Sequence, residues 1–551
     1  MNINEYIVKT LEEIGVDHVF GGSGQVNAPL MIALNKSKKI KTLIVRNEQA
    51  ASFAACGYAM FNSDKLGVCF ATGGPGAFNV MSGLGVALSD SIPVLAITGY
   101  EAEDVIGKGA LAETSGLNRT PDTRKMFDVL TKKSFIITDP GQTCDILEEA
   151  INISFAGRPG PVHIHIPIDL TTCEVPNPKD ANIKTQTLPP VQRQVEAAAD
   201  AIASAIRVDN NLMLIIGYGA VRSSAEKEIL NLVDIYQIPF ATTMDGKGIL
   251  PENHPLSLGV IGNSGDPGAK EYFDSANMVI AIGNSFAQNA TYRFLDDLYK
   301  NKILIHINID KNEIGKVYEP DYPILGDARL AVSSLGDMLS DKAGGVQKKT
   351  IKSDKWFNKP VDYTGSKIHP AHMVKIISDN LPENSIIVGD AGGHMLWLNC
   401  YLNLSKNQRY QNPGSFGPMA SNVNSAIGIK CAHPDKHVIS ACGDGGYLMG
   451  GFELLTAVEY DIPVVWIIFN NGEFNIIKQF LLKLFGEAPM MQFRNPDYVM
   501  YAKACGAVGF RVEKAEELEG VFKKAISLNK PVIIDVVVEE NVYPPFGLEG
   551  I

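Results

Sequence analysis

Short apolar runs alternate with segments of helical periodicity along most of the chain. The runs are rich in Val, Ile and Phe and are bounded by Gly-rich turns, as in the buried strands of parallel sheets. Eight clear examples are residues 66–71, 94–98, 212–216, 278–282, 303–309, 386–388, 437–441 and 464–470. Apolar strands that alternate with helices predict an α/β protein made of doubly wound parallel sheets.

Two stretches interrupt this alternation. Residues 175–194 are polar and rich in proline, and residues 341–369 are rich in Lys, Gly and Ser, so both are typical of linkers. They divide the 551 residues into three predicted α/β domains, at 1–180, 190–340 and 365–551.

Composition and charge exclude several classes of protein. The chain is 45% hydrophobic and 20% charged, which is typical of a globular protein and not of a disordered or fibrous one. Its net charge of −12 argues against nucleic-acid or anionic-membrane partners. The eight cysteines form no C-x-x-C pair, and neither a signal-peptide pattern nor an apolar run of about 20 residues is present. We expect a cytoplasmic protein without a membrane partner.

A Gly-x-Gly turn in the middle block resembles half of a dinucleotide fingerprint. Gly217 and Gly219 follow the apolar run 212–216, but Arg222 occupies the position of the third glycine. Because a large side chain there hinders close packing of helix on strand, a conventional NAD site is not expected.

The most informative segment is Gly443-Asp444-Gly445-Gly446, which follows one apolar run and precedes a helix-period segment. Asn471 follows the next apolar run, 27 residues after Asp444. One β-α-β unit fits this interval and would bring both side chains to the carboxyl ends of neighbouring strands. A carboxylate, an amide oxygen and a main-chain carbonyl suit Mg²⁺, and Gly-rich main chain suits a diphosphate.

These residues resemble the signature of the thiamine diphosphate (ThDP) enzymes of the acetohydroxyacid (acetolactate) synthase and pyruvate oxidase type. The resemblance covers nearly the whole chain and implies ThDP and Mg²⁺, with pyrimidine-binding, central and diphosphate-binding domains in that order. It implies that Asp444, Asn471 and the main-chain oxygen of Glu473 hold the metal. Residues 390–394 resemble the second diphosphate-binding loop of these enzymes, and Met419 matches the residue that wedges the cofactor into a V. The residues of this half implied in cofactor binding are Ala391, Gly392, Gly393, His394, Gly417, Met419, Gly443, Asp444, Gly445, Gly446, Asn471, Glu473, Phe474, Asn475 and Ile476.

The N-terminal block carries the matching half of the resemblance. Glu48 stands at the end of an apolar strand, where the family has the acid that activates the cofactor's pyrimidine ring. Thr72 and Asn79 lie in a stretch that resembles the turn over the pyrimidine. In this family the glutamate acts on a cofactor held by another subunit, which implies a homodimer or homotetramer.

The residues near the reacting carbon favour a carboligase that joins a 2-oxoacid donor such as pyruvate to a carbonyl acceptor. Related decarboxylases place a histidine where Thr72 stands, and a pocket poor in proton donors leaves time for an acceptor to react. Gln25 occupies a loop position that faces the substrate in relatives. A non-ligating decarboxylase or oxidase of the same fold remains an alternative, as does a catalytically silent ThDP-fold protein.

Differences in sequence from acetohydroxyacid synthases leave two questions open: which acceptor is used, and whether FAD is bound. Phe480 replaces a tryptophan of the acceptor pocket, and Ile476 replaces a nearby methionine. By analogy with related ligases, these changes favour an acceptor such as a keto-sugar over the usual branched-chain precursor. Residues 242–248 resemble FAD-contacting stretches, whereas residues 283–289 lack the two arginines of the FAD motif.

Overall fold

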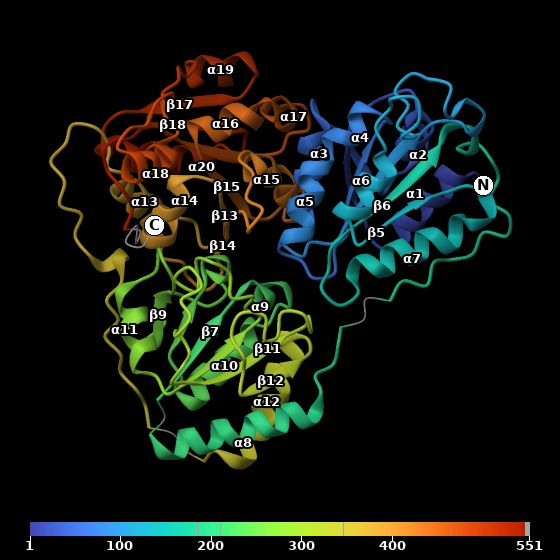
Figure 1. The fold of residues 1–551 in the computed structure, drawn as a ribbon. Coiled ribbons are helices and arrows are strands. Elements are labelled where there is room, and N and C mark those ends of the chain that lie inside the picture. Colours follow the sequence, from blue (N-terminus) through green and yellow to red (C-terminus); the bar gives the residue numbers. More distant parts are fainter. Residues whose placement is uncertain (185–186, 210, 345–346, 546–551) are drawn as a thin grey trace.

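The computed structural model describes residues 1–184, 187–209, 211–344 and 347–545, which form three lobes (Figure 1). Each lobe is built around a six-stranded sheet with helices on its faces. Every pair of neighbouring strands is parallel. The predicted class of three doubly wound parallel-sheet domains is therefore confirmed. Residues 185–186 and 345–346, within the two predicted linkers, lie outside the described residues.

The N-terminal lobe has the strand order β2-β1-β3-β4-β6-β5. Its strands are β1 (His18–Gly21), β2 (Lys41–Ile44), β3 (Gly67–Ala71), β4 (Val94–Tyr100), β5 (Lys133–Ile136) and β6 (Pro161–Pro167). Its α-helices are α1 (Ile3–Glu13), α2 (Ala28–Lys36), α3 (Glu48–Met60), α4 (Pro75–Asn79), α5 (Met81–Ser89), α6 (Thr123–Leu130) and α7 (Thr143–Phe155).

The central lobe has the strand order β12-β11-β10-β7-β8-β9. Its strands are β7 (Leu212–Ile216), β8 (Phe240–Thr242), β9 (Ser257–Val260), β10 (Met278–Ile282), β11 (Ile303–Asn308) and β12 (Tyr322–Leu325). Its α-helices are α8 (Gln192–Val208), α9 (Tyr218–Arg222), α10 (Glu226–Tyr236), α11 (Pro267–Ser275) and α12 (Ala328–Lys342).

The C-terminal lobe has the strand order β14-β13-β15-β16-β18-β17. Its strands are β13 (Ser385–Gly389), β14 (Arg409–Gln411), β15 (His437–Gly443), β16 (Val464–Asn470), β17 (Val508–Val512) and β18 (Val532–Val537). Its α-helices are α13 (Pro370–Asp379), α14 (Gly393–Tyr401), α15 (Ser421–Ala432), α16 (Asp444–Gly450), α17 (Leu454–Glu459), α18 (Asn475–Phe485), α19 (Tyr498–Ala504) and α20 (Ala515–Ser527), and the 3-10 helix η6 (Gly451–Glu453) joins α16 to α17.

Each sheet has one point at which the strand order reverses. These points lie between β1 and β3, between β7 and β10, and between β13 and β15. At such a point the loops that follow the two neighbouring strands run in opposite directions and leave a crevice at the carboxyl ends of the strands. Ligands bind in this crevice in open α/β sheets. The fold therefore provides three candidate crevices.

Helices α3 and α15 join the N-terminal and C-terminal lobes by a very close crossing (Figure 1). A Cβ atom at Gly57 would overlap the carbonyl oxygen of Ser425, and one at Gly428 would overlap that of Ala54. Ser425 Oγ donates a hydrogen bond of 3.0 Å to the carbonyl of Phe53. A single hydrophobic core contains buried residues from both helices, so the two lobes share their interior.

Among the described residues, no helix is both long enough and apolar enough to cross a membrane.

We expect Gly428→Ala to destabilise the protein by about 1–3 kcal/mol, because the new methyl group overlaps main chain of α3 that cannot move independently of its helix. The measurement is the free energy of unfolding from urea titration.

Gly520→Ala on α20 is the matched control. Nothing lies within 4 Å of a Cβ at that position, so the change should be neutral or stabilising by up to about 1 kcal/mol through helix propensity. Equal effects of the two substitutions would show that the α3–α15 crossing does not need its glycine.

Candidate functional site

The loops after β13, β15 and β16 meet at the reversal point of the C-terminal sheet. The strands are in register there, with Gly389 beside Ala441 and Gly443 beside Phe469. Asp444 begins α16 at the end of β15, and its carboxylate is 2% exposed.

Main-chain and side-chain amides surround the Asp444 carboxylate. Its Oδ2 accepts hydrogen bonds from Asn471 N at 3.1 Å, Gly472 N at 2.7 Å and Asn495 Nδ2 at 2.8 Å, and its Oδ1 accepts one from Gly445 N at 2.9 Å. Burial raises the pKa of Asp444 above its ordinary value, and these hydrogen bonds oppose the shift. The structure thus brings Asp444 and Asn471 together, as their spacing predicts.

Asn471 and Glu473 are the other two residues that the resemblance implies in metal binding. Asn471 Oδ1 accepts a hydrogen bond of 3.3 Å from Glu473 N. The Glu473 carboxylate is bonded by Lys478 at 2.8 Å and by Asn475 Nδ2 at 2.7 Å, and its main-chain carbonyl accepts a hydrogen bond of 3.0 Å from Asn475 N. In the described parts of the chain, no cluster of three or more His, Cys, Asp or Glu side chains could hold a metal. A carboxylate, an amide oxygen and a carbonyl are ligands suited to Mg²⁺.

His394 fills the space between the two glycine-rich loops. A Cβ at Gly392 would lie 2.7 Å from its ring and one at Gly443 would lie 3.2 Å away, so neither position has room for a side chain. Burial lowers the pKa of His394 to about 4, which keeps the ring neutral. Its Nε2 is buried without a hydrogen-bond partner among the described residues. The bare main chain of these two loops fits a diphosphate group.

Asp390 anchors the loop that carries Gly417 and Met419. The Asp390 carboxylate is fully buried and accepts hydrogen bonds from Ala420 N at 2.8 Å and Asn422 N at 3.0 Å. Burial raises its pKa to about 6. Ala420 has a φ of +70°, so the chain turns sharply just after the half-buried Met419.

The start of α18 packs over these loops. The Phe474 ring would lie 2.6 Å from a Cβ at Gly445, which explains that glycine, and it contacts Phe493 with centroids 4.7 Å apart. Ile476 packs against a small cluster of buried side chains from two lobes, Met244, Val260 and Leu396. Phe480 lies one turn further along α18 and is partly exposed.

Sequence reasoning missed Asn495 and the role of Asp390. Asn495 Nδ2 bonds both Asp444 Oδ2 and Asn470 Oδ1, each at 2.8 Å, from a loop without any recognisable motif. Asp390 was visible at the end of an apolar run, but its partners follow 30 and 32 residues later.

A second group of predicted residues meets at the reversal point of the N-terminal sheet. Glu48 begins α3, and its Oε2 accepts a hydrogen bond of 2.9 Å from Asn79 Nδ2. A Cβ at Gly22 would lie 2.6 Å from the Glu48 side chain, and one at Gly24 would overlap Thr72. Gln25, next in the same loop, is exposed.

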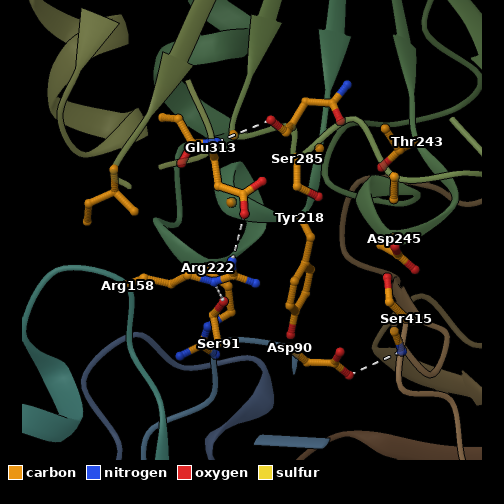
Figure 2. A pocket seen from close by; sticks show the side chains of 18 of the residues that line it. Asp90, Ser91, Arg158, Tyr218, Arg222, Thr243, Asp245, Ser285, Glu313 and Ser415 are labelled. Carbon is orange, nitrogen blue, oxygen red and sulfur yellow. Dashed lines mark hydrogen bonds and ion pairs between the residues drawn. The ribbon is translucent and has the colours of Figure 1, made fainter. Parts of the chain in front are cut away.

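A cavity of about 760 Å³ lies at the third reversal point, where all three lobes meet (Figure 2). The Tyr218 ring points across it toward Asp90 of the N-terminal lobe. Burial raises the pKa of Asp90 to about 6 and that of Asp245 to about 7, with the charge of Asp90 adding to the second shift.

The glycines and the arginine of the Gly-x-Gly turn have packing roles at this cavity. Gly217 N and Gly219 N donate to the carbonyls of Ile282 and Gly283, both at 2.9 Å. Arg222 Nη1 reaches the N-terminal lobe and donates to the carbonyls of Ala59 and Met60, both at 2.7 Å, at the end of α3.

Two further cationic side chains that line the cavity, Arg158 and Lys316, also form bonds within the protein. Arg158 bonds Glu313 at 3.3 Å and Ser91 Oγ at 2.7 Å, and Lys316 pairs with the same Glu313 (Figure 2).

Comparison with known proteins assigns all three lobes. Three thiamine pyrophosphate (thiamine diphosphate) enzyme models match: the N-terminal TPP binding domain at residues 1–119, the central domain at 195–335 and the C-terminal TPP binding domain at 390–536. The chain is 35% identical to a probable acetolactate synthase large subunit of Methanococcus aeolicus, over 98% of this chain and 92% of that protein. It is 32% identical to the acetolactate synthase large subunit of Corynebacterium glutamicum, over 97% and 86%, and 31% identical to that of Porphyra purpurea, over 96% and 91%.

The chain therefore belongs to the thiamine diphosphate-dependent enzymes, in the family of the acetolactate synthase large subunits. The predicted resemblance is confirmed, and with it the prediction of an enzyme that uses thiamine diphosphate.

Proposed function

We propose that the enzyme is a carboligase that decarboxylates pyruvate, or a similar 2-oxoacid, and transfers the acyl unit to a carbonyl acceptor. The observation that carries the proposal is the absence of a histidine beside Glu48 and Thr72 in the N-terminal lobe. All three histidines of that lobe are engaged elsewhere. His18 bonds Asp17 at 2.7 Å, and both His163 and His165 bond Thr98 at 2.9 Å. A site without this proton donor favours capture of the bound acyl unit by a second carbonyl.

The chemistry divides between cofactor and protein. When bound, ThDP supplies a thiazolium carbon that adds to the 2-oxoacid and accepts the electron pair released on loss of CO₂. Glu48 would hold a proton at the pyrimidine ring nitrogen, with Asn79 orienting its carboxylate. Gln25 and Thr72 would contact the donor, and the exposed Gln25 is free to hydrogen-bond to a carboxylate or carbonyl.

The C-terminal lobe would hold the other end of the cofactor. Asp444, Asn471 and the Glu473 carbonyl would bind Mg²⁺, and the glycine loops with His394 would bind the diphosphate. Met419, held by the Asp390 anchor, would support the ring system. The support for the metal is the buried carboxylate of Asp444, which a divalent cation would stabilise.

We further propose that two copies of the chain form each active site. The main chain just before Glu48 bonds Glu453, which follows the C-terminal end of α16, whereas Asp444 stands at the N-terminal end. At 1.5 Å per residue α16 is about 10 Å long, and Glu453 lies beyond its C-terminal end, in the direction away from the diphosphate loops. Leu448, Met449 and Phe452 on the same segment are 39%, 55% and 62% exposed, which suits a subunit interface.

The acceptor pocket would lie near α18. Ile476 and Phe480 offer apolar side chains of moderate size where acetohydroxyacid synthases carry a methionine and a tryptophan. This difference supports an acceptor other than a second small 2-oxoacid, and a keto-sugar is the first candidate to test.

The central cavity is a poor match for FAD. A flavin dinucleotide needs donors for its diphosphate, and the Gly217 and Gly219 amides and the Arg158 and Lys316 side chains are bonded within the protein. Among the described lining residues, Arg222 Nε and the Arg329 side chain are the cationic donors left at this cavity. Asp90 also lines the cavity, and its carboxylate, with a pKa raised to about 6, is mostly charged at neutral pH and would repel a dianion. We infer an enzyme that works without FAD.

We expect Asp444→Ala to weaken Mg²⁺ and ThDP binding together, each by at least about tenfold, because the metal and the diphosphate share this carboxylate. Isothermal calorimetry of each ligand in the presence of the other measures both. Unchanged affinities would remove Asp444 from the metal site.

Incubation with pyruvate, ThDP, Mg²⁺ and a panel of aldehydes, ketones and keto-sugars tests the reaction. We expect CO₂ release with a ligated product, and a loss of more than about tenfold in turnover for Glu48→Gln with unchanged folding. Free aldehyde as the sole product would contradict the carboligase, and no turnover of any 2-oxoacid would favour the silent alternative.

The purified protein should show no flavin absorption in the visible range, and added FAD should not raise its turnover. A stoichiometric flavin released by heat denaturation would contradict this prediction.

A further inference from the structure

The short connection between β2 and α3 sets the position of Glu48, and the C-terminal lobe holds this connection from outside. Arg46 N donates to Glu453 Oε1 at 2.9 Å and to Oε2 at 3.2 Å, and Asn47 N donates to Oε1 at 3.1 Å. These two amides immediately precede Glu48 and lie before the first turn of the helix, where no helical carbonyl is available to accept from them. One carboxylate thus satisfies the two amides that lead into α3.

Glu453 is well placed for this task. Its side chain is 3% exposed, and it ends η6, directly after α16. Thr456 Oγ1 donates a further hydrogen bond to Glu453 Oε2. Burial raises the pKa of Glu453, while these three donors favour the anion, and hydrogen bonds to a buried carboxylate are strong.

Neighbouring residues add further contacts, of which the Arg46–Glu459 pair is solvent-exposed and therefore weak. Arg46 Nη1 donates to Thr456 Oγ1 at 3.2 Å, and Arg46 Nη2 pairs with Glu459 at 2.5 Å. Ile44 N donates to the Tyr460 hydroxyl at 3.0 Å. The segment 453–460 of the C-terminal lobe therefore holds the segment 44–47 of the N-terminal lobe through both main chain and side chain.

The opposite end of α3 is also held by another lobe. Arg222 of the central lobe donates to the last carbonyls of the helix, Ala59 and Met60. With both ends fixed, a shift of α3 along its axis must break charge-assisted hydrogen bonds at one end or the other.

We propose that Glu453 is a positioning residue for the reaction: it holds the main chain of Arg46 and Asn47 so that the Glu48 carboxylate meets the cofactor's pyrimidine nitrogen. This inference rests on the proposed role of Glu48. An error of about 1 Å in the placement of a catalytic group costs on the order of 100-fold in rate. The hydrogen bonds from Arg46 N and Asn47 N to Glu453, which we call the clamp, are close enough to Glu48 to affect its placement directly. In the proposed two-chain site, Glu453 also joins the diphosphate-binding helix of one active site to the activating carboxylate of the other.

Glu453→Ala and Glu453→Gln test the proposal. The alanine variant removes the acceptor, so kcat should fall at least about 30-fold, while KM for the 2-oxoacid and the ThDP affinity stay within about twofold. The glutamine variant keeps one acceptor oxygen and should recover kcat to within about fivefold of the unmodified enzyme.

Amide hydrogen exchange of the cofactor-free protein supplies a readout that does not depend on activity. The Arg46 and Asn47 amides should exchange at least about tenfold faster in Glu453→Ala, whereas amides in the middle of α3 keep their rates. This result would hold even if the chain turned over no 2-oxoacid, so failure of the proposed function can be told from failure of the clamp.

Glu459→Gln is the matched control, because Glu459 contacts the Arg46 side chain but not the main chain before Glu48. We expect kcat within about twofold of the unmodified enzyme. The proposal would be overturned by a kcat of Glu453→Ala within about threefold of the unmodified enzyme, by a parallel loss of ThDP affinity, or by unchanged exchange of the two amides.

Discussion

The close crossing of α3 and α15 is the contact on which the relative placement of the N-terminal and C-terminal lobes depends. Glycine at positions 57 and 428 lets the two helices approach until main chain meets main chain. α3 begins with Glu48, and α15 begins just after Met419 and the Asp390 anchor. The crossing therefore fixes Glu48 relative to the C-terminal lobe of its own chain.

The N-terminal and C-terminal sheets share one strand order and the central sheet has another, yet each has a reversal point near its middle, and the groups at these three points differ. In the C-terminal lobe, bare glycine main chain and buried amides surround Asp444. In the N-terminal lobe, Glu48 and Asn79 face small residues. In the central lobe, the corresponding turn is bonded to its neighbours, and Arg222 links that lobe to the end of α3.

The structural features that depend on local sequence could be predicted, and those that depend on partners far away in the sequence could not. The strands were visible as apolar runs, and Asp444 with Asn471 as one β-α-β interval. Asn495 and Glu453 carry no local signal, because their roles come from partners that the fold brings together. Glu453 is 407 residues from Arg46, and no periodicity or spacing connects them. In the sequence Arg222 is only a departure from a glycine pattern, whereas in the structure its guanidinium donates to two carbonyls at the end of α3 in the N-terminal lobe.

The contacts of Glu453 hold Glu48 near the far end of α16 from Asp444 of the same chain, which supports the proposal that two chains complete each active site. Co-expression of Glu48→Gln and Asp444→Ala chains with two different tags, followed by purification through both, tests it most directly. A mixed dimer then has one site with both defects and one with neither, and we expect about half the turnover of the unmodified dimer although each parent variant is inactive. Mixed dimers as inactive as the parents would show that Glu48 and Asp444 of the same chain serve one site.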